Sequence, residues 1–340
     1  MPSLKEIKGR INSISSTLAI TSAMKMVAAA KLQKAQMAIQ NMLPYERRLH
    51  SMLIDLMGAV NMSAPASEEG SARLVSLSNQ PDHTESEGAY SLMAQREVRK
   101  VAIVAFASNS SLCGAFNSNV IREATAVINE YRASGLGDAD ITVYSVGRKM
   151  AEAMKKLGFP SPADFTKMSD SPASALAQEL LDGFVSGRFD KVELVYNHYK
   201  STSSQPTIRQ TYLPLSLADA TADLQAGKIA DSASESDTNR GAEPVGAPVV
   251  RQGSPTTEDL IVEPSKEELI ATLLPKVVRL RVFTTLLDST AAEQAARTVA
   301  MQLATDNGND LLQELTLEYN KGRQQKITSE ILDLVGGSMQ

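Results

Sequence analysis

The chain has 340 residues, of which 43% are hydrophobic and only 4% aromatic, and its formal net charge is −5. This length allows two or three domains, while the low aromatic content favours helical rods over one large globular core. The single cysteine, Cys113, excludes an internal disulfide and is typical of a reducing compartment, and the longest clean apolar run, residues 101–107, is too short to cross a membrane.

The first predicted element is an amphipathic helix from Ser3 to about residue 57. Its apolar side chains recur at steps of three and four: Leu4, Ile7, Ile11, Ile14, Leu18, Ala28, Leu32, Ala35, Ile39, Met42, Leu49 and Leu56. Thr21 and Lys25 share this frame. So narrow a stripe is typical of a helix that packs along another helix. Ser3 and Glu6 predict a capping box, and Pro44 predicts a kink or a loosened turn.

The middle of the chain, residues 97–215, alternates strand and helix signals. Strands are predicted at 101–107, 141–146, 191–199 and 207–213, and helices at 118–133, 148–157 and 172–186. This alternation predicts a mostly parallel sheet with crossover helices. A short connection predicts that the last two strands are antiparallel neighbours.

A second long helix is predicted from Ser265 to residue 335, where two glycines end it. Its stripe comprises Leu273, Val277, Leu280, Thr284, Leu287 and Ala291. Ser265 and Glu268 predict another capping box, and Pro275 a bend or break. Gly308 and Gly322 are interpreted as tolerated costs of roughly 1 kcal/mol each. The two terminal helices are expected to wind on each other as a long antiparallel coiled coil, with a Rossmann-like α/β domain inserted between them, a mixed α+β and α/β fold.

The chain divides by composition into five parts. These are the helix 1–60, a polar and disordered loop 61–96, the α/β domain 97–215, an acidic and disordered insertion 216–260, and the helix 261–340. Residues 1–50 carry eight basic and two acidic residues, a net charge of about +6. A helix so basic predicts an acidic partner: nucleic acid, anionic lipid or an acidic protein surface.

Motifs for catalysis or cofactor binding are scarce. The sequence contains no phosphate-binding loop of the G-x-x-x-x-G-K-[ST] type, and the glycines at 135–137 lack the third glycine of a dinucleotide fingerprint. Residues 110–116 follow a predicted buried strand and precede a helix, a place where nucleophiles often lie. The favoured interpretation is an ordinary strand-to-helix turn with Cys113 as a packing residue. No catalytic, cofactor-binding or metal-binding residue is expected, since the histidines are scattered: His50, His83 and His198.

Two short segments are open to two interpretations. Met24 and Lys25 lie mid-helix beside small residues, so they either pack in the stripe or present a charge to an outside partner. Arg323, Gln324 and Lys326 form a polar band on the last helix that is either an ordinary solvated face or a contact surface.

Several motifs, taken in order, resemble the γ subunit of the rotary F-type ATP synthase of the bacterial type. They span almost the whole chain, at residues 4–8, 20–32, 112–119, 147–149, 304–307, 315–320, 323–324 and 327–331. The resemblance implies a non-catalytic subunit without a cofactor. Its terminal helices would form a central stalk inside a ring of three α and three β subunits. Its middle domain would meet the ε subunit and the c-ring, so that proton flow drives ATP synthesis.

The resemblance also implies contact residues and a location. Met24 and Lys25 match the helix position that faces an acidic loop of β. Arg323, Gln324 and Thr328 match the band that bonds to loops of the catalytic subunits. The chain would lie at the cytoplasmic face of the bacterial inner membrane and meet the membrane only through the complex.

The main alternative is a basic coiled-coil adaptor that binds nucleic acid. Only one aromatic residue, Tyr45, lies among the basic residues of segment 1–50 for base stacking, and the last helix lacks the positive charge. An enzyme that uses Cys113 is a further alternative, against which the absence of a partner histidine counts.

Overall fold

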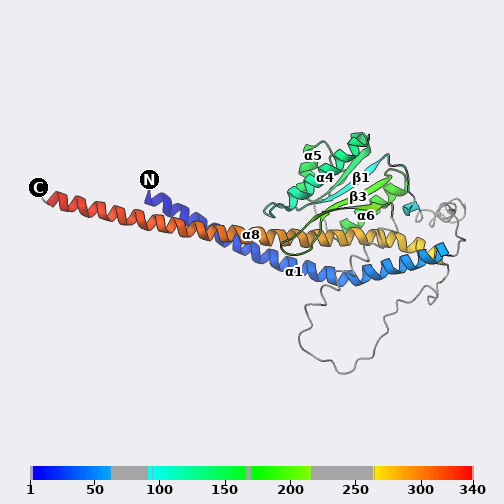
Figure 1. The fold of residues 1–340 in the computed structure, drawn as a ribbon, viewed down its shortest axis with the longest axis horizontal. Coiled ribbons are helices and arrows are strands. Elements are labelled where there is room, and N and C mark those ends of the chain that lie inside the picture. Colours follow the sequence, from blue (N-terminus) through cyan, green and yellow to red (C-terminus); the bar gives the residue numbers. More distant parts are fainter. Residues whose placement is uncertain are drawn as a thin grey trace, which may run out of the picture.

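The computed structural model describes residues 3–62, 91–93, 95–165, 170–215, 263 and 265–338. Two long helices, α1 (Leu4–Met62) and α8 (Lys266–Ser338), form a rod, and an α/β domain lies on its side (Figure 1). The start of α1 and the end of α8 lie at the same end of the rod, so the helices run in opposite directions. We call α1 and α8 together the shaft. The predicted polar segments 61–96 and 216–260 lie largely outside the described residues.

Both shaft helices begin as their sequences predict. Ser3 Oγ accepts a hydrogen bond from the Glu6 amide at 3.3 Å, and Ser265 Oγ accepts one from the Glu268 amide at 3.2 Å. Each serine therefore satisfies an amide that the first helical turn leaves free. Neither proline interrupts its helix, and α8 continues past the predicted glycine stop to Ser338.

The stripe predicted on the first helix is the face that α1 turns toward the rest of the molecule. Every residue of that stripe is buried or half-buried, whereas Lys5, Lys8 and Gly9 beside it are exposed. Thr305 Oγ1 lies 3.1 Å from Thr21 Oγ1, which ties α8 to α1 across the stripe. Spacing alone was enough to predict this face because a 3.6-residue period leaves few alternatives.

Two of the glycines of α8, Gly308 and Gly322, lie against side chains of α1, which the sequence analysis did not predict. A Cβ added at Gly308 would lie 2.7 Å from Leu18 Cδ2, and one added at Gly322 would lie 3.2 Å from Leu4 Cδ2. Leucines of α1 therefore occupy the space over glycines of α8. The interpretation of Gly308 as merely tolerated was wrong, because its missing side chain lets Leu18 approach closely, whereas the longer contact at Gly322 leaves that interpretation open there.

The α/β domain contains one four-stranded sheet. Its strands are β1 (Val101–Phe106), β2 (Ile141–Val146), β3 (Lys191–Asn197) and β4 (Thr207–Leu213), in the spatial order β2-β1-β3-β4. β1 is parallel to β2 and β3, and β4 is antiparallel to β3. The predicted strand order along the chain and the antiparallel last pair are confirmed.

Helices cover both faces of the sheet. α4 (Phe116–Ala133) and α5 (Arg148–Lys156) pack on one face, and α6 (Asp170–Val185) packs on the face toward the shaft. Short 3₁₀ turns occupy Ser91–Met93 (η2) and Asp138–Asp140 (η3). The α6 face shares one apolar core with both shaft helices, through Leu53 of α1 and Val278 of α8. The buried Tyr212 hydroxyl donates to the Val278 carbonyl at 3.0 Å.

A buried carboxylate lies on the other face of the sheet. Glu193 is 1% exposed and accepts hydrogen bonds from the Tyr131 hydroxyl at 2.5 Å, Arg209 Nε at 2.6 Å and Lys191 Nζ at 2.7 Å. Burial raises the pKa of Glu193, but hydrogen bonds from Arg209, Lys191 and Tyr131 outweigh it and leave the pKa below its usual value. The carboxylate is therefore ionised and paired in the folded chain.

Candidate interaction surfaces

The turn around Cys113 is a packing turn, which confirms the interpretation that the sequence favoured. Cys113 is 1% exposed, its Sγ lies 3.1 Å from Asn117 Nδ2, and its side chain packs against Ala292 of α8. Leu112 before it has a φ of 69°, and Gly114 after it has a φ of 59°. A thiol enclosed in this way cannot meet a substrate, which removes the enzyme interpretation built on Cys113.

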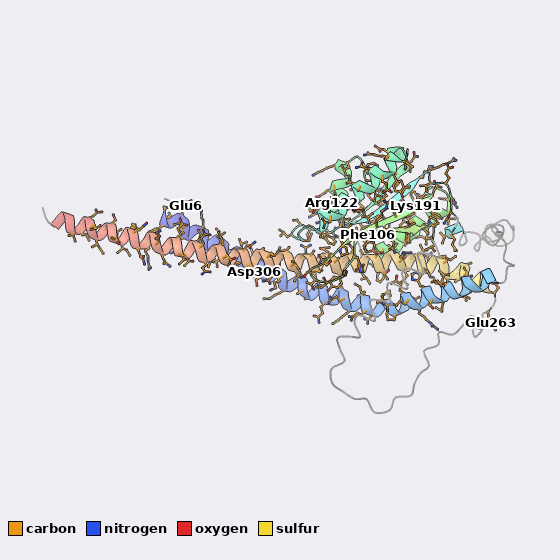
Figure 2. The ribbon with its side chains drawn as sticks, in the orientation of Figure 1. Glu6, Phe106, Arg122, Lys191, Glu263 and Asp306 are labelled. Atoms are coloured by element: carbon orange, nitrogen blue, oxygen red, sulfur yellow. The ribbon has the colours of Figure 1, made fainter. Side chains whose placement is uncertain are left out.

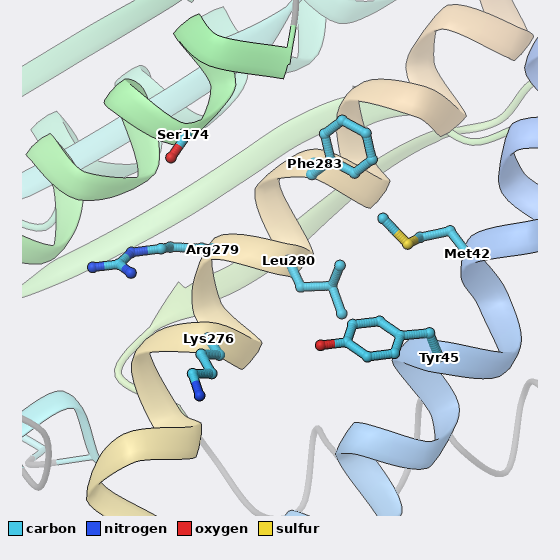
Figure 3. Close-up of a pocket in the computed structure, with 7 residues that line it drawn as sticks. All are labelled: Met42, Tyr45, Ser174, Lys276, Arg279, Leu280 and Phe283. Atoms are coloured by element: carbon cyan, nitrogen blue, oxygen red, sulfur yellow. The ribbon is translucent and has the colours of Figure 1, made fainter.

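The described residues contain no cluster of side chains that could bind a catalytic metal ion. Within them no group of three or more histidine, cysteine or carboxylate side chains could hold a metal ion, and no helix is long and apolar enough to span a membrane. A hollow of about 330 Å³ opens between α1, α6 and α8 (Figure 3). Its lining contains neither a carboxylate nor a histidine: Met42, Tyr45, Ser174, Lys276, Arg279, Leu280 and Phe283. The lining therefore offers no acid–base pair.

The first predicted contact position lies partly in the helix seam. Met24 and Lys25 are both half-buried, and Lys25 stands on the stripe that α1 turns inward. Met26 and Val27 are instead 69% and 55% exposed. The outward apolar surface at this level therefore belongs to Met26 and Val27, which lie just off the stripe.

The second predicted contact position lies where α8 runs on alone. Gly322 packs against Leu4, the first residue of α1, and α8 continues beyond that point (Figure 1). At 1.5 Å per residue, the part of α8 from residue 323 to residue 338, which lies beyond the start of α1, is roughly 24 Å long. Arg323, Gln324 and Thr328 are all exposed there, and the Thr328 hydroxyl donates to the Gln324 carbonyl at 2.9 Å.

Several large apolar side chains are exposed near the end of α8. The exposed large apolar residues of this part are Leu317, Ile327, Ile331, Leu332, Leu334 and Val335. Leu334 is 74% exposed. An exposed apolar surface of this kind marks a contact with another molecule. The structure does not bring the two predicted contact positions together, because they lie at different levels of the shaft.

The charge of the shaft differs between its two helices. The exposed lysines of α1 are Lys5, Lys8, Lys31 and Lys34, whereas α8 exposes the acids Asp306, Asp310, Glu314 and Glu318 along the part that begins near the contact of Gly308 with Leu18. Figure 2 shows Asp306 on α8 close to where the two helices cross. Acidic side chains along one side of the shaft would repel a phosphate backbone, which counts against the nucleic-acid adaptor.

The family model and the similar sequences agree on the family of this chain. A family described as ATP synthase matches residues 3–339. The chain is 47% identical to the ATP synthase gamma chain of Phocaeicola vulgatus over 343 residues, covering 100% of both chains. It is 38% identical to that of Flavobacterium johnsoniae, covering 99% of this chain and 98% of the relative.

Solved structures share the fold. The rotor of the Euglena gracilis mitochondrial ATP synthase in rotational state 1 matches with a TM-score of 0.51 at 19% identity, covering 95% of this chain and 98% of that one. An OSCP/F1/c-ring structure of the same enzyme in rotational state 3 matches with a TM-score of 0.54 at 20% identity, covering 99% and 93%. The full-length family match and the close relatives together show that the chain belongs to the gamma chain family of the ATP synthase.

Proposed function

We propose that this gamma chain works as a rotating shaft in which α1 and α8 form an antiparallel coiled coil and that it carries no active site of its own. The observation that carries the proposal is the shape of the rod. One end is a single helix with an exposed apolar surface, and the other end shares a core with an α/β domain. A rod with a bearing at one end and a fixed body at the other can turn as a unit.

The free end of α8 suits a rotating contact. Leu332, Leu334 and Val335 expose apolar side chains, and contacts between apolar surfaces are not directional. A tip that makes few directional bonds would turn in an apolar sleeve with little resistance. We assign this tip to the top of a ring of three α and three β subunits.

The sides of the shaft suit contacts that differ around the ring. The lysines of α1 and the acids of α8 give the shaft unlike faces, so that three β subunits would meet three different surfaces at any moment. Met24 and Lys25 would meet an acidic loop of β, with the Lys25 stem packed in the seam and its ammonium group reaching outward. Arg323 and Gln324 would donate to loops of the catalytic subunits, and the Thr328 hydroxyl would accept from them.

The α/β domain would form the base of the rotor. In this assignment it contacts the ε subunit and the c-ring at the cytoplasmic face of the bacterial inner membrane. Proton flow would turn the c-ring and the shaft, driving ATP synthesis on the β subunits. The division into 1–60, 61–96, 97–215, 216–260 and 261–340 then separates shaft, base and two polar insertions.

Isolation of the complex tests this function. A tagged chain would be extracted gently in detergent from its native membranes, and the recovered subunits and ATPase activity would be measured. We expect an ATPase that contains three copies each of two larger nucleotide-binding chains for each copy of this one. Recovery of the chain alone, or with nucleic acid and without ATPase, would contradict the proposal.

A further inference from the structure

The hollow between α1, α6 and α8 carries positive charge that no acid balances in the part of the chain that the structure describes. Lys276 and Arg279 both project into it from α8 (Figure 3). Neither forms an ion pair with a described carboxylate. The Arg279 guanidinium donates instead to the Gln178 amide oxygen at 2.6 Å, and Gln178 Nε2 donates to Asp182 at 2.8 Å. Two cations one helical turn apart on an exposed surface favour an anionic partner.

The rest of the lining is mainly apolar. Met42 and Tyr45 contribute from α1, and Leu280 and Phe283 contribute from α8. The Tyr45 side chain is 56% exposed. A small anion such as phosphate would use the two cations and leave this apolar surface open. A peptide segment that carries both carboxylates and aliphatic side chains would use both parts of the lining. The volume of about 330 Å³ lies at the lower end of the roughly 300–1,000 Å³ that small-molecule sites have, which also favours a few side chains over a larger ligand.

The chain contains a segment of this chemistry directly before α8. Residues 216–260 hold eight acidic and three basic residues, a net charge of −5. The segment and the residues that follow it read Glu-Asp-Leu-Ile-Val over 258–262, so two carboxylates precede three aliphatic side chains. Its charge is opposite to that of the hollow, and its aliphatic residues match the apolar part of the lining.

The acidic segment also ends close enough to the hollow to reach it. Lys276 follows Ser265, the residue before α8, by eleven residues, which is about 16 Å along the helix. Asp259 precedes Ser265 by six residues, and six residues can span up to about 20 Å. A chain that turns back at Ser265 can therefore bring Asp259 to Lys276. A partner tethered so closely has an effective concentration in the millimolar range, so even weak ion pairs favour docking.

We propose that the hollow is a docking site for the chain's own acidic segment 216–260, whose carboxylates pair with Lys276 and Arg279 while aliphatic side chains of the same stretch cover Tyr45. The hollow then serves a contact within one chain, and neither another subunit nor a small molecule occupies it. Docking would keep the acidic segment on the chain that carries it. The inference is independent of the proposed rotor function, because it concerns one chain alone.

Cross-linking of the purified full chain tests the docking without any substitution. A carbodiimide joins a lysine amine to a carboxylate that it touches, and mass spectrometry of the digested monomer identifies the joined pair. We expect Lys276 to be linked to acids of 216–260 at least fivefold more often than Lys155, an exposed lysine of α5. Raising the salt concentration from about 0.05 M to about 0.5 M should lower the yield from Lys276 at least threefold, because salt screens exposed ion pairs. Equal yields from the two lysines would overturn the proposal.

The same reaction on the assembled complex separates the chain's own segment from an acidic partner. We expect the link between Lys276 and 216–260 to form there as well. Links from Lys276 to another subunit, without a link to 216–260, would show that a partner takes the hollow and would overturn the proposal. A chain that never assembles into an ATPase would contradict the proposed rotor function and leave the result on the purified chain standing.

Reversal of the charge on the hollow gives a second readout. The variant combines Lys276→Glu with Arg279→Glu. Its matched control combines Lys155→Glu with Lys156→Glu at the exposed end of α5. Trypsin cleaves after Arg251 within the acidic segment, so the rate of that cut reports how far the segment is protected. We expect the cut to be at least threefold faster in the hollow variant and unchanged in the control, with equal helical circular dichroism. An equal rate in the hollow variant and the parent chain would refute the docking, and the cross-linking decides alone if the variant does not fold.

Discussion

Replacing one glycine of α8 tests the close approach of the shaft helices. Gly308→Ala should gain about 1 kcal/mol from better helix propensity. The new Cβ would lie 2.7 Å from Leu18 Cδ2 and 3.2 Å from Leu18 Cγ, so the leucine must move. Overpacking of this kind costs about 1–3 kcal/mol. The net expectation is a destabilisation of up to about 2 kcal/mol, against the rule that alanine favours a helix.

Gly322→Ala is the matched control on the same helix. Its Cβ would lie 3.2 Å from Leu4 Cδ2, and Leu4 begins α1, where the backbone can shift more easily. At this position the higher helix propensity of alanine should outweigh the contact with Leu4, so the free energy of unfolding should rise by about 0.5–1 kcal/mol. Leu18→Ala in the same chain as Gly308→Ala removes the obstructing side chain. In that background the Gly308→Ala change should become stabilising by about 1 kcal/mol.

Urea unfolding of the purified full chain, followed by helical circular dichroism, measures these differences. The midpoints of the parent chain, Gly308→Ala, Leu18→Ala and the double variant form a double-mutant cycle between positions 18 and 308, with Gly322→Ala outside it. The reasoning would be refuted if Gly308→Ala stabilised the chain as much as Gly322→Ala does. It would also be refuted if removing Leu18 left the effect of Gly308→Ala unchanged.

Three further changes test other parts of the account. Lys25→Glu should leave the helical content intact but lower the number of protons pumped per ATP hydrolysed by the assembled complex. An unchanged ratio would contradict the proposed contact between Lys25 and an acidic loop of β. Glu193→Gln should destabilise the chain by about 3 kcal/mol because its cationic partners lose a buried carboxylate, as urea unfolding would show; a loss below about 1 kcal/mol would contradict that pairing. The hydrogen bond to Asp288 raises the pKa of His198, so this stabilisation is complete below the unfolded pKa of about 6.5 and is lost as pH rises through the folded value. Between about pH 5.5 and about pH 8.5, the melting temperature should therefore fall more in the parent chain than in the His198→Gln variant. If the two proteins show parallel curves of melting temperature against pH, the His198–Asp288 pair does not stabilise the fold in this way.

Local pattern predicted most of the fold. The steps of three and four in α1 identified its inward face, and the runs VAIVAF and ITVYSV gave two strands to within a residue. These elements depend on side-chain period and on short apolar runs, which a single sequence displays directly. The capping serines were predictable for the same reason, since their bonds reach only three residues along the chain.

Contacts between distant segments could not be predicted in this way. The role of Gly308 depends on Leu18, and the role of Asp288 depends on His198 and Tyr199, each pair far apart in the sequence. Spacing placed Lys25 on the stripe, but it could not show how far the side chain is buried. Pairings of this kind are set by the register of the helices and by the docking of the domain, which tertiary packing alone decides.

Observation of rotation in single complexes tests the central claim most directly. The ring of catalytic subunits would be fixed to a surface, and a bead would be attached to a single new cysteine placed at exposed Ser134 in the Cys113→Ser background. Adding ATP should turn the bead in one direction, with three pauses in each turn, because three catalytic subunits act on one shaft. A bead that stays still while the same complexes hydrolyse ATP would contradict the account.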